Sequence, residues 1–313
     1  MHGIHSRQAL ISRIVLALAA ALVALGTVTH AASAYETTAT YVTSWGTVGS
    51  GQGQLRSPGG VGVHSGNVYV ADTANNRIEE FHPYGHFVKS FSAGHQLSQP
   101  LAVAADETGH VYVADTGNSR IVKFTAHGEF VRAWGSHGTN HDQFRHPIGI
   151  AAHADHVYVT DGNRIKKFTT HGVLVRVWNA LGDQGGLANG VAVDAGHVYV
   201  TVASQYTTGV VKFTTGGAFV REWGSFGPAV GQFATPVGIA ISPRHHIFVA
   251  DTGHSRIEKF TEDGAFMEAW GSLGSGANQF LFPRGIAVDG NGHIYVADGG
   301  NNRIEKFFEP VAF

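Results

Sequence analysis

One short motif recurs six times along this chain and limits the folds that are open to it. The stretch HVYVADTGNSRIVKF at residues 110–124 is its clearest copy. The central aromatic residues of the six copies are Tyr69, Tyr112, Tyr158, Tyr199, Phe248 and Tyr295, spaced by 41 to 49 residues. Periods of this length, built from several short strands and without a 3.6-residue pattern, are typical of radial arrays of small sheets rather than helical solenoids.

Each copy divides into four short strands separated by turn residues. In the second copy the expected strands are 101–105, 110–114, 120–125 and 130–134, and clusters of Gly, Asp, Asn and His-Gly lie between them. Such a unit predicts one four-stranded antiparallel blade. The fold predicted for the chain is therefore all-β, a six-bladed β-propeller.

The first strand of each unit alternates small and large residues, as in GIAA at 149–152 and GIAV at 285–288. Because successive side chains face opposite sides of a strand, the large residues pack against one neighbouring blade and the small ones let the other approach. This pattern predicts the innermost strand. A Trp ends most units, and a later Gln-Phe pair such as Gln143-Phe144 predicts an aromatic plug between blades.

The two ends of the repeat region complement each other. The sixth copy stops without a fourth strand, whereas the region begins with an unattached strand, Tyr41–Gly46. We expect this N-terminal strand to complete the last blade, which would tie the ends together and remove an open sheet edge.

Residues 1–34 have the pattern of a secretory signal peptide. Arg7 and Arg13 precede an apolar run at 14–28, and Ala32-Ser33-Ala34 fits a cleavage site. The alternative is an uncleaved anchor, but this run is shorter than the roughly 20 residues that span a bilayer. We expect residues 35–313 to form the exported chain, a single propeller in the extracellular space or cell envelope.

Composition excludes several functions. Residues 35–313 contain 19 basic and 23 acidic side chains, a formal charge of −4, which argues against nucleic acid as a partner. The sequence contains no cysteine, so thiolate catalysis, thiolate-bound metals and disulfides are excluded. The exported fold must be held by packing.

The unit resembles the NHL repeat, best at Pro100–Phe124 and Pro283–Phe307. The resemblance, to six-bladed propellers of the secreted, bacterial type, covers roughly residues 39–313. It implies a fold more than a function, because one fold hosts many activities.

The repeated turn and its departures point to different roles. The Asp-to-Arg turns at 72–77, 115–120, 251–256 and 298–303 recur from blade to blade, so we interpret them as scaffold rather than acid–base machinery. The third copy shortens this turn at 160–165, and the fourth loses it at 201–211. The alternative for these departures is sequence drift.

A binding site is predicted on the face that carries the altered turns. Residues just before the first-strand glycine should surround one mouth of the central channel, and two of them are polar, Asn189 and Arg284; solvated rim residues are the alternative. The ring is Gly59, Leu101, Ile148, Asn189, Val237 and Arg284. The candidate ligand-binding residues are Asn189, Gln205, Tyr206, Arg284, Arg145 and His146.

A second ring lies at the opposite ends of the same strands. Imidazole and carboxylate groups there would bind a divalent ion such as zinc or calcium if they turned to the axis. The alternative is that each Asp begins the turn to the next strand. The candidate metal ligands are His64, Asp106, His153, Asp194 and Asp289.

Three classes of function follow. The first is a binding module for an extracellular protein, peptide or glycan, which needs no cofactor and which we expect to be monomeric. The second is implied by the resemblance: NHL-like propellers include peptide-amidating lyases, and other six-bladed propellers are lactonases or antibiotic lyases, usually with a metal in the channel. The third, RNA binding, is opposed by the export signal and the charge. We favour the binding module.

Overall fold

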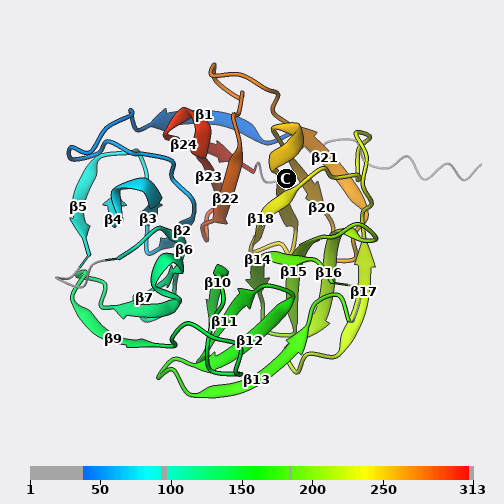
Figure 1. The fold of residues 1–313 in the computed structure, drawn as a ribbon. Coiled ribbons are helices and arrows are strands. Elements are labelled where there is room, and N and C mark those ends of the chain that lie inside the picture. Colours follow the sequence, from blue (N-terminus) through cyan, green and yellow to red (C-terminus); the bar gives the residue numbers. More distant parts are fainter. Residues whose placement is uncertain (1–37, 93–96, 183–184, 310–313) are drawn as a thin grey trace, which may run out of the picture. The chain divides into compact units, whose positions relative to one another are not determined.

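The computed structural model describes residues 38–92, 97–182 and 185–309, which form six four-stranded antiparallel sheets (Figure 1). Blades one to three contain β2 (Val61–His64), β3 (Asn67–Asp72), β4 (Arg77–Phe81), β5 (Phe87–Phe91); β6 (Pro100–Ala105), β7 (Val111–Asp115), β8 (Arg120–Phe124), β9 (Phe130–Trp134); and β10 (Pro147–His153), β11 (His156–Asp161), β12 (Arg164–Thr169), β13 (Leu174–Asn179). Blades four to six contain β14 (Leu187–Val193), β15 (His197–Ala203), β16 (Thr208–Thr214), β17 (Phe219–Trp223); β18 (Pro236–Ile241), β19 (Ile247–Asp251), β20 (Arg256–Phe260), β21 (Phe266–Trp270); and β22 (Pro283–Val288), β23 (His293–Asp298), β24 (Arg303–Phe308), β1 (Thr40–Trp45). The only helices in these residues are single 3₁₀ turns, η1 (Thr73–Asn75), η2 (Thr116–Asn118), η3 (Thr252–His254) and η4 (Gly299–Asn301).

The predicted closure is confirmed. Strand β1 pairs antiparallel with β24, with Trp45 opposite Ile304 and Thr40 opposite Phe308. Figure 1 shows the blue first strand beside the red last one. The two ends of the described chain therefore share one sheet, and the last blade has no missing outer strand.

The six innermost strands, β2, β6, β10, β14, β18 and β22, surround the central axis in sequence order (Figure 1). Their small residues let adjacent backbones approach closely, as the alternation predicts. A Cβ on Gly238 would lie 2.0 Å from the carbonyl oxygen of Arg284 in the next blade. Only glycine fits at this position.

The hydrophobic core lies in the seams between neighbouring blades. One cluster joins Tyr112 and Ile121 of the second blade to Ile150 and Val157 of the third. Phe144, from the loop that connects these blades, is fully buried in the same cluster. The predicted aromatic plug is confirmed here, and Phe233 and Phe280 fill equivalent places in later seams.

The predicted signal peptide, residues 1–34, lies outside the described residues. In the part of the chain that the structure describes, no helix is long and apolar enough to cross a membrane.

Gly172 provides a test of the seam packing. Its φ is +77°, and an added Cβ would lie 2.8 Å from the Trp134 ring of the preceding blade. Gly66 has a similar φ of +82° with no atom within 4 Å of an added Cβ. The free energy of unfolding of Gly66→Ala should therefore fall only by the cost of the left-handed backbone conformation, roughly 1–2 kcal/mol. The free energy of unfolding of Gly172→Ala should fall by about 1–3 kcal/mol more, because the added methyl group overpacks the seam.

Urea unfolding of the two variants beside the parent protein measures both changes. Equal losses of unfolding free energy in the two variants would show that the Trp134 contact contributes nothing to the seam.

Candidate binding site at the axial mouth

One face of the propeller carries the beginnings of all six inner strands, and we name it the mouth face. Because neighbouring strands run antiparallel, it also carries the turns between second and third strands and the loops that enter each new blade. The opposite face, named the base face, carries the turns between first and second strands and between third and fourth strands.

A β-bulge lies near the start of five of the six inner strands. In β10 the pairing with β11 runs from Pro147 opposite Asp161 to Ile150 opposite Val159, so the residues between them leave the regular register. The same shift follows the start of β6, β14, β18 and β22. Bulges commonly re-aim side chains in this way.

A cavity of about 310 Å³ opens at the centre of the mouth face. The six positions expected to surround the channel all line it, so this prediction is confirmed. The lining residues are Gly59, Gly60, Leu101, Ala102, Ile148, Gly149, Asn189, Gly190, Thr235, Val237, Gly238, Thr252, Arg284 and Gly285. The surface is mainly apolar, with polar groups concentrated in the fourth, fifth and sixth blades.

Arg284 supplies the only charged group of this lining among the described residues. Its side chain is half-buried, and it forms no hydrogen bond or ion pair with any described residue. Gly299 provides space beside it, since an added Cβ there would lie 3.5 Å from Cδ of Arg284. The site therefore holds a guanidinium group whose donors are not used by the fold.

Gly299 replaces a threonine that other blades use to join their neighbours. The hydroxyls of Thr73, Thr116 and Thr252 donate to the carbonyl of Pro100, Pro147 and Pro283 respectively, at 2.6–2.7 Å. The sixth blade lacks this hydrogen bond because Gly299 has no hydroxyl group. The sequence signal is Gly-Gly after Asp298 in place of Thr.

Asn189 is a seam residue as well as a lining residue. Its side chain is 7% exposed, and Nδ2 donates to the carbonyl oxygen of Pro236 at 2.9 Å. Its own carbonyl accepts from the Thr160 hydroxyl at 2.5 Å. Asn189 thus fixes the fourth blade against both neighbours.

The other four candidate residues lie on the mouth face but do not line the cavity. Gln205 and Tyr206 occupy the exposed turn between β15 and β16, and Tyr206 is 71% exposed. Arg145 and His146 are exposed in the loop before β10, where both backbone N–H groups donate to Asp161 Oδ1 at 2.8 Å. The cavity brings together only Asn189 and Arg284 of the predicted set.

Sequence comparison identifies the repeat. A sequence model described as NHL repeat matches residues 55–81, 97–124, 233–260 and 280–307. The chain belongs to the NHL-repeat propeller family. The matches fall on blades one, two, five and six, and the third and fourth blades, whose turns depart from the motif, are not matched.

Solved structures with the same fold include enzymes and a binding propeller. A streptogramin B lyase has 16% identity and a TM-score of 0.61 over 86% of this chain and 97% of its own. A gluconolactonase from Xanthomonas campestris has 13% identity and a TM-score of 0.62 over 83% and 88%. A chain of a nidogen/laminin complex has 16% identity and a TM-score of 0.54 over 68% and 79%. No curated protein sequence matches significantly. At these identities the likeness concerns the fold alone.

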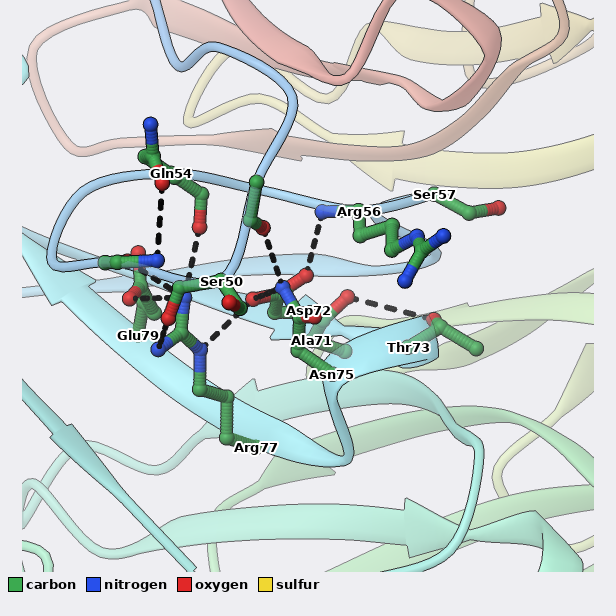
Figure 2. A network of polar contacts seen from close by, with 12 residues as sticks. Ser50, Gln54, Arg56, Ser57, Ala71, Asp72, Thr73, Asn75, Arg77 and Glu79 are labelled. Carbon is green, nitrogen blue, oxygen red and sulfur yellow. Dashed lines mark hydrogen bonds and ion pairs between the residues drawn. The ribbon is translucent and has the colours of Figure 1, made fainter.

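The repeated Asp-to-Arg turn of this NHL propeller is a network of internal contacts (Figure 2). Asp72 accepts hydrogen bonds from the Arg56 backbone N–H at 2.7 Å, from Arg77 Nε at 2.8 Å and from Asn75 Nδ2 at 2.7 Å. Asp298 repeats this pattern with Leu281, Arg303 and Asn301. Both carboxylates accept hydrogen bonds from the surrounding loops, as the scaffold interpretation predicts.

Three buried glutamates behind this network were missed by the sequence analysis. Glu79, Glu258 and Glu305 are fully buried, and each pairs with the Arg two residues earlier at 2.6–2.8 Å. Burial raises the pKa of each carboxyl to about 7, against the lowering effect of the arginine. The available signal was the Arg-Ile-Glu triplet, which reads RIV in the second blade and RIK in the third.

The raised pKa values of these glutamates predict that the protein becomes less stable as the pH rises. Their folded pKa of about 7 lies above the ordinary 4.5, so between these values the folded state binds more protons than the unfolded state. The free energy of unfolding should fall as pH rises through this window, by up to about 3 kcal/mol per carboxyl. Below pH 4.5 and above pH 7 these groups should contribute no slope.

Glu79→Gln and Glu305→Gln should each remove part of that slope. Chemical denaturation of parent and variants at pH 5 and pH 8 measures it, because the remaining titrating groups cancel in the difference. A variant whose stability changes between the two pH values as much as that of the parent would contradict the assignment.

The five candidate metal ligands do not converge on the axis. Asp106 accepts from the Tyr112 hydroxyl at 2.8 Å and the His110 backbone N–H at 2.9 Å. Asp289 makes equivalent contacts with Tyr295 and His293. His153 lies 3.3 Å from Glu107, and His64 contacts Ser65. In the described residues Asp106, Asp289 and His64 make contacts within their own turns, His153 contacts the turn of the preceding blade, and only Asp194 joins a potential metal-binding cluster.

Proposed function

We propose that this protein is an exported binding module that holds an extracellular peptide, protein segment or glycan at the axial mouth by one of its carboxylates. The observation that carries the proposal is Arg284, a half-buried guanidinium in the cavity wall without a partner among the described residues. A peptide is the ligand class that we commit to test.

Electrostatics favours a carboxylate at this position. A guanidinium group presents two parallel N–H donors that match the two oxygens of a carboxylate. The apolar wall formed by Leu101, Ile148 and Val237 lowers the local dielectric, which strengthens such a pair. Burial without a partner leaves donor capacity for a ligand to satisfy.

The size of the cavity limits what enters it. A volume of about 310 Å³ is at the small end of ligand pockets and suits one side chain or a chain terminus. The remainder of the ligand would then lie across the mouth face. Large apolar side chains are exposed in its loops: Val48, Phe226, Leu273 and Phe282, together with Tyr206.

The chemistry of the lining favours binding over acid–base catalysis. Among the described residues that form the cavity wall there is no carboxylate, imidazole or amine to move a proton. The nidogen/laminin neighbour supports a binding role for this fold, whereas the lyase and gluconolactonase neighbours support the alternative of an enzyme. We prefer the binding module because the described cavity wall lacks groups that could transfer a proton.

Arg284→Ala should weaken peptide binding by roughly tenfold to a hundredfold, the effect of one charge-assisted hydrogen-bonded pair. Arg176→Ala is the matched control, because Arg176 is exposed on the outer strand β13 and does not line the cavity. The probe is a heptapeptide library prepared with free and with amidated C-termini, and with and without acidic side chains. Fluorescence anisotropy measures the affinity of selected peptides.

Three results would count against the proposal. They are selection of peptides without any carboxylate, equal weakening by Arg176→Ala, and full binding by Arg284→Ala. Mass spectrometry of recovered peptides separates binding from turnover, since a module returns them unchanged and an enzyme does not.

A further inference from the structure

Three hairpins meet on the base face at the seam between the fourth and fifth blades. The turn between β14 and β15 contributes Asp194 and His197, the turn between β18 and β19 contributes His245, and the turn between β20 and β21 contributes Glu262. Ligand atoms of Asp194, His197 and Glu262 all lie within 4.8 Å of one another. No other described group of three such side chains does so.

The distances within this cluster suit one small cation. His197 Nδ1 lies 3.5 Å from Glu262 Oε1 and 3.9 Å from Asp194 Oδ1, and His245 Nδ1 lies 3.9 Å from Asp194 Oδ2. A tetrahedral zinc ion with bonds of about 2.0–2.2 Å separates its ligand atoms by about 3.3–3.6 Å. Small side-chain rotations would bring the ligand atoms of Asp194, His197 and Glu262 to that spacing, whereas His245, which lies near Asp194 but outside this group of three, would have to turn further.

The equivalent positions of the second and sixth blades lack two of the four groups. They keep the same Asp and His, as Asp106 with His110 and Asp289 with His293. The residue that corresponds to His245 comes from the first turn of the following blade, and it is Asp155 beside the second blade and Gly66 beside the sixth. In their own first turns the second and sixth blades have Gly109 and Gly292 at this place. In the place of Glu262 the facing turns have Thr170 and Pro83, whose backbone carbonyls accept a hydrogen bond from the local lysine.

His245 departs from glycine at a left-handed position. Its φ is +61°, whereas Gly109 and Gly292 have φ of +86° and +85°. The fifth blade therefore carries a backbone cost that the other two avoid. The imidazole that results is placed toward Asp194 of the preceding blade.

We propose that Asp194, His197, His245 and Glu262 bind one divalent transition-metal ion, with zinc as the best match. Two imidazoles and two carboxylates form a donor set that suits zinc better than calcium, which prefers oxygen ligands alone. The ion joins the fourth and fifth blades at their base, away from the mouth cavity, and this inference does not depend on the proposed function.

Charge balance permits the ion. Lys212 Nζ lies 2.8 Å from Glu262 Oε1, and the Tyr199 hydroxyl lies 3.3 Å from the same oxygen. Two carboxylates and one ammonium leave the cluster with one negative charge, so a divalent cation changes it to one positive charge. Lys212 positions Glu262 and also weakens the attraction, so we expect moderate rather than very tight binding.

The test uses the exported chain without an affinity tag that contains histidine. Calorimetric titration with zinc chloride after chelator treatment should show one equivalent bound, and cobalt(II) should give the visible absorption of a tetrahedral site. A zinc excess of about a hundredfold over Kd should raise Tm by roughly 5 °C.

His197→Gln and Glu262→Gln should each weaken zinc binding at least tenfold and reduce the Tm rise at the same zinc concentration by about half or more. His293→Gln is the matched control, because it alters the same turn in the sixth blade, where the additional donors are absent. Equal Tm values of all proteins in chelator establish that the variants fold. Stoichiometric binding retained by His197→Gln, lost equally in His293→Gln, or absent from the parent protein would each overturn the proposal.

Discussion

The close approach of adjacent inner strands is the constraint on which the rest of this structure depends. Without cysteine, the propeller is held by packing, and each seam must bury large side chains on both sides while the backbones nearly touch at the axis. Gly238 against the Arg284 carbonyl shows how little space remains. The closing β1–β24 pair extends the same packing to the chain ends, so that every blade has two neighbours.

This constraint explains how much the sequence could predict. Strand order, the closure and the ring of six mouth positions follow from a motif that repeats with fixed turn chemistry, and each was confirmed. The roles of single residues within the ring did not follow. Asn189 lines the cavity, and its part in ligand binding stays a prediction, but its amide nitrogen also donates to the Pro236 carbonyl across a seam that the motif does not reveal.

Contacts between blades were the main information missing from the sequence. The cluster around Asp194 needs a histidine 51 residues later at position 245 and a glutamate at position 262, and neither belongs to the motif. The buried glutamates were missed for a related reason. A carboxylate at a strand position that the second and fourth blades fill with valine and the third with lysine is recognisable as buried only when the loop that covers it is known.

The symmetry of the repeat also explains why both proposed sites lie where the motif changes. A group present in all six blades would appear six times around one axis, and six guanidinium groups lining a cavity of about 310 Å³ would repel one another strongly. A single Arg284 avoids that repulsion and needs only one altered turn, the Gly-Gly of the sixth blade, to give it space. On the base face, the Asp of the repeated Asp-His pair interacts electrostatically with a local lysine in the second and sixth blades, and a new property arises only where a neighbouring blade adds Glu262 and His245. In a propeller of near-identical blades, the repeated residues maintain the seams, and the residues that differ from the repeat are available to bind a ligand.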